Sequence, residues 1–145
     1  MSASDSSVIE MKMPCDSKFL SVVRLAVAGA AARSGLAVAV IDDVKVAVSE
    51  ACTNVIQHAF PPGEGLAQRS LTVRMDVREG ELRLEVLDEG NGFDPKHLPR
   101  ADPDEVAERE GGLGIFLMQG LMDEVKIESA PGSGTRVLLI KRRAR

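Results

Sequence analysis

Two short segments of alternating apolar and polar residues constrain the fold more than any other feature of this sequence. Residues 71–78 read LTVRMDVR and residues 81–87 read ELRLEVL, with only Glu79-Gly80 between them. Alternation with a period of two is typical of a strand that is buried on one face. A two-residue connection that contains glycine is typical of a β-hairpin. We therefore expect an antiparallel hairpin with the apolar side chains of its second strand on one face.

The other expected elements follow from similar patterns of periodicity, caps and breakers. They are a strand at 8–13, a helix over about 19–30 capped by Asp16-Ser17 and stopped by Gly35, a helix that starts at Asp42-Asp43 and ends before Pro61, a helix over 114–122, and a second hairpin formed by 124–128 and 135–141. This order predicts an α+β two-layer sandwich, in which helices cover one face of a mainly antiparallel, mixed sheet.

The chain length of 145 residues suits a single domain with one core. We expect residues 1–7 to be a flexible leader and residues 8–145 to form the domain. Residues 94–110 are polar and contain three prolines. Long loops of this kind in compact domains are often lids, and we expect one here.

Composition excludes several classes of function. The formal net charge is −4 and aromatic residues make up only 3%, with no Trp or Tyr, which disfavours direct binding of nucleic acid. The basic tail 141–145 is the exception, and we expect it to be a solvated terminus. Neither a secretory signal nor an apolar run long enough to span a bilayer is visible, so a cytoplasmic location is expected. Cys15 and Cys52 lie far apart and predict neither a disulfide framework nor a zinc site.

The second helix carries an unusual stripe of polar residues. Glu50, Asn54 and His58 recur at intervals of four in the segment SEACTNVIQHAF. Residues four apart share one helix face. Because the surrounding residues are mostly apolar, little of this helix is free for water, and the stripe requires polar partners. For His58 we expect only a structural hydrogen bond at the helix end.

Three glycine-containing clusters complete the set of candidate functional segments. DEGNG (88–92) follows a strand, EGGLG (110–114) precedes a helix, and GSGT (132–135) enters a strand. Taken singly, the first and third are typical hairpin turns, and the second is equally compatible with a hinge or with a phosphate-binding loop at a helix N-terminus.

The order and spacing of these segments resemble the Bergerat, or GHKL, ATP-binding superfamily of histidine-kinase-like ATPases. Within it, four segments are similar to the anti-sigma-factor serine kinases of the RsbW and SpoIIAB type: AVSEACTNVIQHAF, DEGNGFDP, REGGLGIFLMQGLMDEV and GSGTRVLLIK. The resemblance covers nearly the whole chain and implies binding of ATP and Mg²⁺.

The resemblance also implies roles for individual residues. Asn54 would bind Mg²⁺ through its amide oxygen, and Glu50 would orient or deprotonate the attacking hydroxyl. Asp88 would accept the adenine amino group, with support from Thr135. The remaining implied nucleotide contacts are Gly90 and Gly92 beside the purine, Gly111, Gly112, Leu113 and Gly114 around the phosphates, and Arg109 at the end of the lid.

By the same resemblance, the chain would phosphorylate a serine of a STAS-type anti-anti-sigma partner and sequester a sigma factor, as a homodimer. Two alternatives stay open. One is a non-catalytic, ATP-gated binding switch. The other is the ATP-binding module of a two-component histidine kinase, which would need a phosphoacceptor histidine on a dimerising helical hairpin.

Overall fold

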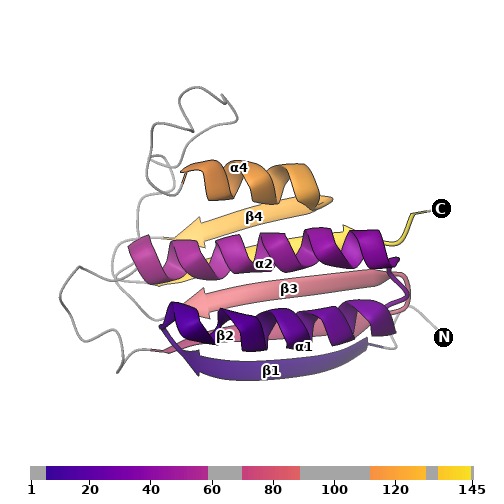
Figure 1. Ribbon diagram of the computed structural model, residues 1–145, viewed down its shortest axis with the longest axis horizontal. Helices are drawn as coiled ribbons and strands as arrows, with labels where there is room; N and C mark the ends of the chain where they lie inside the picture. Colours follow the sequence, from indigo (N-terminus) through magenta and orange to yellow (C-terminus); the bar gives the residue numbers. More distant parts are fainter. Residues whose placement is uncertain (1–5, 59–69, 89–111, 130–133, 145) are drawn as a thin grey trace.

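The computed structural model describes residues 6–58, 70–88, 112–129 and 134–144 (Figure 1). In chain order the elements are β1 (Ser6–Pro14), the 3₁₀ helix η1 (Ser17–Phe19), α1 (Leu20–Arg33), α2 (Val38–His58), β2 (Ser70–Arg78), β3 (Glu81–Asp88), α4 (Gly112–Leu121), β4 (Glu124–Ser129) and β5 (Thr135–Arg142). Within these ranges, no helix combines the length and the apolar character needed to cross a membrane.

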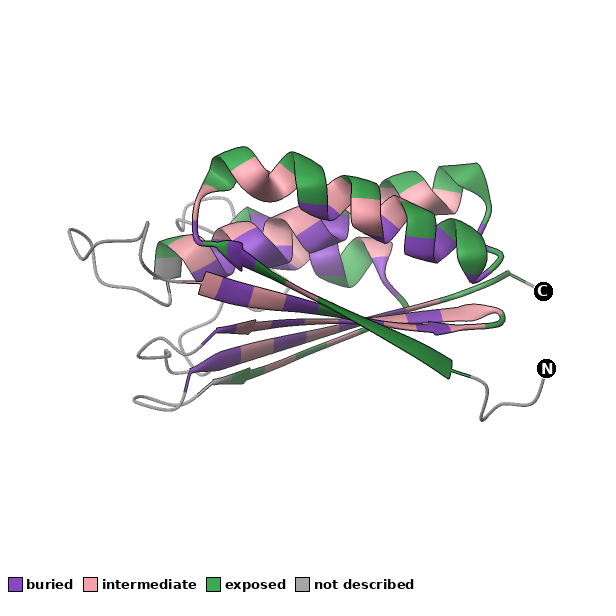
Figure 2. Ribbon diagram, turned by 90° about the horizontal axis from the view of Figure 1, so that it is seen from below, coloured by how far each residue is buried: buried purple, intermediate pink, exposed green. Residues whose placement is uncertain are grey.

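The strands form one five-stranded sheet in the order β1-β2-β3-β5-β4. All four pairings between described strands are antiparallel. Helices α1, α2 and α4 lie together on one face of this sheet, as the edge-on view in Figure 2 shows. The predicted α+β two-layer architecture is therefore confirmed.

The central hairpin agrees closely with the sequence pattern. β2 and β3 pair with Val73 opposite Val86 and with Arg78 opposite Glu81. Gly80 in the turn has φ +77°, a conformation that glycine adopts without a steric penalty. Alternate residues of both strands are buried on the side that faces the helices, and all of them except Asp88 are apolar. The hairpin therefore packs against the helical layer through this buried face.

The starts of β1 and α2 differ from the predictions. β1 begins at Ser6, so Ser6 and Ser7 of the expected leader pair with Arg78 and Val77 of β2. Helix α2 begins at Val38 rather than at Asp42-Asp43. The Ile41 N–H donates to the Ala37 carbonyl at 2.9 Å, which starts the helical pattern one turn earlier than the acidic pair. The predicted cap was wrong, because both aspartates lie beyond the first turn of the helix, which contains no acidic residue.

The core lies between the helices and the sheet and is aliphatic, as the composition predicts. Its fully buried large side chains include Leu71, Met75, Leu82, Leu84, Met118 and Leu139. Cys15 and Cys52 are also buried, and the two are not joined in a disulfide. Burial, with a smaller effect from Cys15, raises the pKa of the Cys52 thiol to about 12. Cys52 thus behaves as a small apolar residue.

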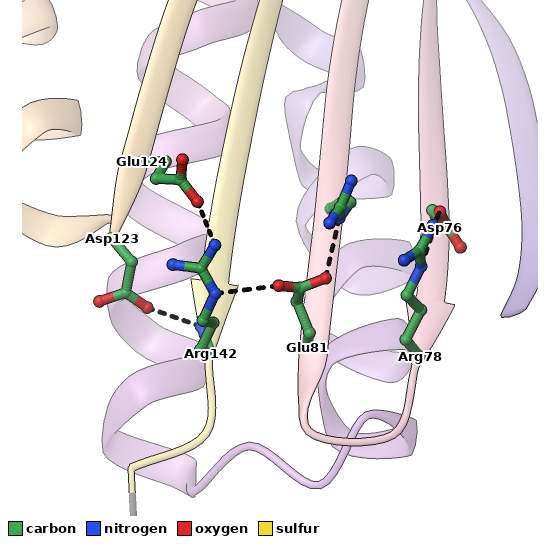
Figure 3. A network of polar contacts seen from close by, with 7 residues as sticks. Asp76, Arg78, Glu81, Asp123, Glu124 and Arg142 are labelled. Carbon is green, nitrogen blue, oxygen red and sulfur yellow. Dashed lines mark hydrogen bonds and ion pairs between the residues drawn. The ribbon is translucent and has the colours of Figure 1, made fainter. Parts of the chain in front are cut away.

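The opposite face of the sheet carries a network of ion pairs (Figure 3). The Glu81 carboxylate accepts from Arg83 Nε at 2.8 Å and from Arg142 Nε at 3.0 Å. Arg142 also pairs with Glu124, and its backbone N–H donates to Asp123. Opposite charges on neighbouring strands favour this register.

The basic tail is exposed at residues 142–144, as expected of a solvated terminus, but its backbone is also hydrogen-bonded to the rest of the domain. The Arg143 N–H donates to the Gly80 carbonyl at 2.8 Å, and the Gly80 N–H donates to the Ser34 carbonyl at 2.8 Å. The Arg143 guanidinium packs along Gly35 and Gly80. The tail therefore joins the α1–α2 turn to the central hairpin, at the right of Figure 1.

Candidate functional site

The polar stripe of α2 is the first part of the candidate site. Asn54 is only 7% exposed, and its Nδ2 atom has no hydrogen-bond partner among the described residues. Glu50, one turn earlier, is half-buried. An amide donor that is buried without a partner costs about 1–3 kcal/mol. A bound ligand would account for that cost.

Two of the three polar side chains of this stripe, those of Glu50 and Asn54, converge on Gly114 in the first turns of α4. A Cβ atom placed on Gly114 would lie 3.4 Å from the Glu50 Cδ atom and 3.6 Å from the Asn54 Nδ2 atom. It would lie closer than 3.0 Å to Glu50 Oε2. The close packing of α2 against α4 therefore brings together three of the residues that the sequence singled out.

The second part of the site lies at the end of the sheet. Asp88, the last residue of β3, and Thr135, the first residue of β5, are register partners. They are 8% and 3% exposed, respectively. Asp88 continues the buried face of β3, so a carboxylate takes a position where the alternation calls for an apolar residue. This interruption of the pattern is a sequence signal for a functional residue.

Figure 1 shows how the two parts are arranged. The arrowhead of β3, the C-terminal end of α2 and the start of α4 lie at the same end of the molecule, at the left of the view. Gly112 begins α4, and Leu113 is 54% exposed. The other predicted nucleotide contacts, Gly90, Gly92, Arg109 and Gly111, and the expected lid at 94–110 lie outside the described residues.

The polar side chains at this site suit a metal ion that takes most of its ligands from a bound nucleotide and from water. Among the described residues, no group of three His, Cys, Asp or Glu side chains forms a protein cage for a metal. Mg²⁺ usually keeps several waters and takes one or two protein groups together with substrate phosphates. The Asn54 amide fits this requirement, because its oxygen would be the one protein ligand of the ion and its buried Nδ2, which lacks a partner among the described residues, would donate to a phosphate oxygen.

Comparison with known proteins agrees with this architecture. The family model described as "Histidine kinase-like ATPase domain" matches residues 13–141. With the five-stranded sheet and its single helical layer, this match makes the chain a member of the histidine kinase-like ATPase domains. ATP is accordingly the nucleotide expected at the site.

Similar proteins of known activity identify the family within the histidine kinase-like ATPase domains. The serine-protein kinase RsbW of Bacillus velezensis is 40% identical over 141 residues, which cover 92% of this chain and 84% of the relative. RsbW of Bacillus subtilis is 38% identical over 132 residues, which cover 86% of this chain and 79% of the relative. The chain belongs to the RsbW family of serine-protein kinases, which confirms both the resemblance and the predicted enzyme class.

A solved structure shares the fold. The RsbU and RsbW domains of Rv1364c from Mycobacterium tuberculosis match with a TM-score of 0.68 at 18% identity. The match covers 96% of this chain and 33% of that longer chain. At this identity the likeness supports the architecture alone, and the roles of individual residues rest on the site itself.

Proposed function

We propose that this protein kinase uses Mg·ATP to phosphorylate a serine of a STAS-type anti-anti-sigma protein and, in alternation, sequesters a sigma factor. It would act in the cytoplasm as a homodimer, without contacting nucleic acid. The observation that carries the proposal is the convergence of Glu50 and Asn54 on Gly114, with the Asn54 amide buried and its Nδ2 without a partner among the described residues.

The roles proposed for these residues follow from the chemistry of phosphoryl transfer. Such a reaction needs positioning of the acceptor and neutralisation of charge more than covalent participation by the protein. Glu50 would orient the acceptor hydroxyl and take its proton. Asn54 would hold Mg²⁺, which supplies charge neutralisation at the phosphates when bound.

The base would be bound at the sheet end of the site. Asp88 would accept a hydrogen bond from the adenine amino group, and Thr135, its register partner, would support the same edge of the base. Gly90 and Gly92 would make room for the purine. Gly111, Gly112, Leu113 and Gly114 would contact the phosphates, together with Arg109.

The test uses labelled ATP, Mg²⁺ and each STAS-type protein of the same genome. We expect one of them to acquire label on serine, which is stable to acid, whereas phosphohistidine is labile to acid. Glu50→Ala should lower transfer by about 10²–10⁴-fold, the usual worth of a general base, while ATP binding is retained. The matched control is Glu10→Ala, because Glu10 is exposed on β1 and pairs only weakly with Arg74 at 3.5 Å.

Each alternative gives a different result in this experiment. A non-catalytic switch would label no partner and would be indifferent to Glu50→Ala. A histidine-kinase module would transfer label to histidine. For the sigma factor, copurification with the unphosphorylated chain is expected, and the absence of any sigma factor in the complex contradicts that part of the proposal. A monomeric mass in solution contradicts the homodimer.

A further inference from the structure

Gly114 has a steric relationship to Glu50 that the resemblance to a phosphate-binding loop does not require. The residue is buried in α4, and the space where a side chain would begin is occupied by the Glu50 carboxylate. The Asn54 amide lies against the same space. Any side chain at this position would have to displace the Glu50 carboxylate or separate the two helices.

The backbone at Gly114 gives no independent reason for glycine. The described glycines with positive φ are Gly35, Gly80 and Gly134, and Gly114 is not among them. Glycine inside a helix is less favourable than alanine by about 1 kcal/mol. The residue is thus unfavourable for helix stability and unnecessary for backbone conformation, which leaves the missing side chain as its contribution.

Other helical glycines in the chain show that this packing is specific. A Cβ atom added at Gly120, in the same helix, meets nothing within 4 Å, and the same holds for Gly29 in α1. Gly120 is exposed, whereas Gly114 is buried at the contact with α2. Of these three positions, only 114 requires glycine for space.

The charge at this contact is complementary. The first turn of α4 contains no acidic residue of its own. The N-terminal end of a helix carries a partial positive charge that favours a nearby carboxylate. Glu50 of α2 supplies that carboxylate, and the absence of a Cβ atom on Gly114 lets it approach.

We propose that Gly114 is a positioning residue: its missing side chain seats the Glu50 carboxylate against the first turns of α4, in the orientation used for phosphoryl transfer. The inference rests on the proposed function, in which Glu50 acts on the acceptor hydroxyl. It adds a steric role to the phosphate contact that the resemblance implies for Gly114.

The test is a double-mutant cycle of Gly114→Ala with Glu50→Asp, whose shorter side chain withdraws from the contact. In the wild-type background, Gly114→Ala should lower kcat by about 10²-fold, the loss expected for a misplaced catalytic group. In the Glu50→Asp background, Gly114→Ala should lower kcat by less than about threefold, because the shorter side chain no longer clashes with the added methyl group. Gly120→Ala is the matched control and should leave kcat unchanged.

Melting temperatures of the same variants test the steric contact without any kinase assay. Gly114→Ala should raise Tm less than Gly120→Ala does in the wild-type background, because displacing the end of the Glu50 side chain offsets part of the gain from alanine in a helix. In the Glu50→Asp background this difference between the two alanine variants should shrink. Gly120→Ala should leave Tm unchanged or raise it, because alanine favours the helix.

The possible outcomes separate this inference from the proposed function. If Gly114→Ala lowers kcat equally in both backgrounds, or raises only the KM for ATP, the positioning role is wrong and a phosphate contact suffices. Equal Tm values for Gly114→Ala and Gly120→Ala also overturn it. If wild-type protein transfers no phosphate while the Tm cycle shows the expected coupling, the proposed function fails and the steric contact stands.

Discussion

Asp88 and Thr135 face each other across β3 and β5, so two buried polar side chains from distant parts of the sequence meet at one end of the sheet. Both lie in the layer that faces the helices, where their strands are otherwise apolar. Their pairing gives the proposed adenine contacts a rigid support, because both backbones are fixed by the ladder.

Asp88→Asn should lower the affinity for ATP by about 10- to 100-fold, since a hydrogen bond to a charged group is worth about 1.5–3 kcal/mol. The preference for ATP over GTP should fall as well. Titration with both nucleotides measures this. Glu85→Gln is the control, because Glu85 lies on the same strand but on the opposite face and pairs with Arg136. Equal affinities for the two variants would contradict the adenine role of Asp88.

Asn54→Leu should separate stability from function. Replacing a buried amide whose Nδ2 lacks a partner with an apolar group of similar size should leave the ligand-free protein equally stable or up to about 2 kcal/mol more stable. The Mg²⁺-dependent part of ATP binding should disappear. Chemical denaturation and ATP titration with and without Mg²⁺ measure the two effects, with the exposed neighbour change Gln57→Leu as control. Mg²⁺-dependent binding that survives in Asn54→Leu rules out the proposed metal role.

Gly35→Ala should destabilise the protein by about 1–2 kcal/mol, the cost of a left-handed conformation in a residue with a Cβ atom. Gly35 has φ +84°, and an added Cβ atom would lie 3.2 Å from Arg143 Nη1. Gly29→Ala is the control and should be neutral or stabilising, because that position is open and helical. Urea denaturation measures both changes. A neutral Gly35→Ala would show that the α1–α2 turn readily adopts another conformation.

The raised pKa of Cys52 predicts that the folded protein loses stability in alkaline solution. Its folded-state pKa of about 12 lies above the ordinary thiol value of about 8.5, so folding favours the protonated form. This contribution is complete below about pH 8.5 and is lost progressively as the pH rises toward 12. Cys52→Ala should weaken the decline, as followed by urea denaturation between pH 7 and pH 11. An identical pH profile in the variant would assign the decline to other groups.

The ion pair between Glu85 and Arg136 predicts a loss of folding stability in acid, smaller than the alkaline loss due to Cys52. Arg136 Nε donates to Glu85 at 2.8 Å, and this hydrogen bond lowers the pKa of Glu85 against the opposing effect of its partial burial. The stability that it contributes is present above about pH 4.3 and is lost as the pH falls through the folded-state pKa. Arg136→Met should reduce this loss by less than about 1 kcal/mol, because the pair is partly exposed.

Denaturation midpoints between pH 3 and pH 7 measure that acid effect. Lys45→Met provides the control, since Lys45 pairs with the exposed Asp42 at 3.9 Å, the outer limit of an ion pair, and contacts neither Glu85 nor Arg136. We expect the Lys45 variant to keep the wild-type pH dependence. If the pH dependence of the denaturation midpoint changes equally in both variants, the Glu85–Arg136 pair does not account for the loss of stability in acid.

Much of the fold was predictable because local patterns dominate in the strands. Alternation located β2 and β3, and Glu79-Gly80 located their turn, since both signals arise from neighbouring residues. The start of α2 was less predictable, because Ala37, which precedes the helix, is not a capping residue type, whereas Asp42-Asp43 further along resembles a cap. The contacts of the exposed Arg143 could not be predicted for a different reason: its partners, Gly35 and Gly80, are distant in sequence.

In the candidate site too, features set by neighbouring residues were predictable, whereas contacts between distant segments were not. The i, i+4 spacing placed Glu50 and Asn54 on one face of a helix, and the structure brings that face against α4. The contact between Glu50 and Gly114 could not be predicted, because it depends on how closely two helices approach. Pairing of Asp88 with Thr135 likewise depends on the strand order, which local patterns do not determine. The chemical roles of these residues stay predictions.

The position of β5 has a consequence for how the protein is made. β5 lies between β3 and β4 in the sheet, although it follows both of them in the chain. During synthesis, β3 therefore has an open edge until β5 leaves the ribosome. Asp88 meets Thr135 only at that moment, so a nascent chain cannot present the proposed adenine contacts before its sheet closes.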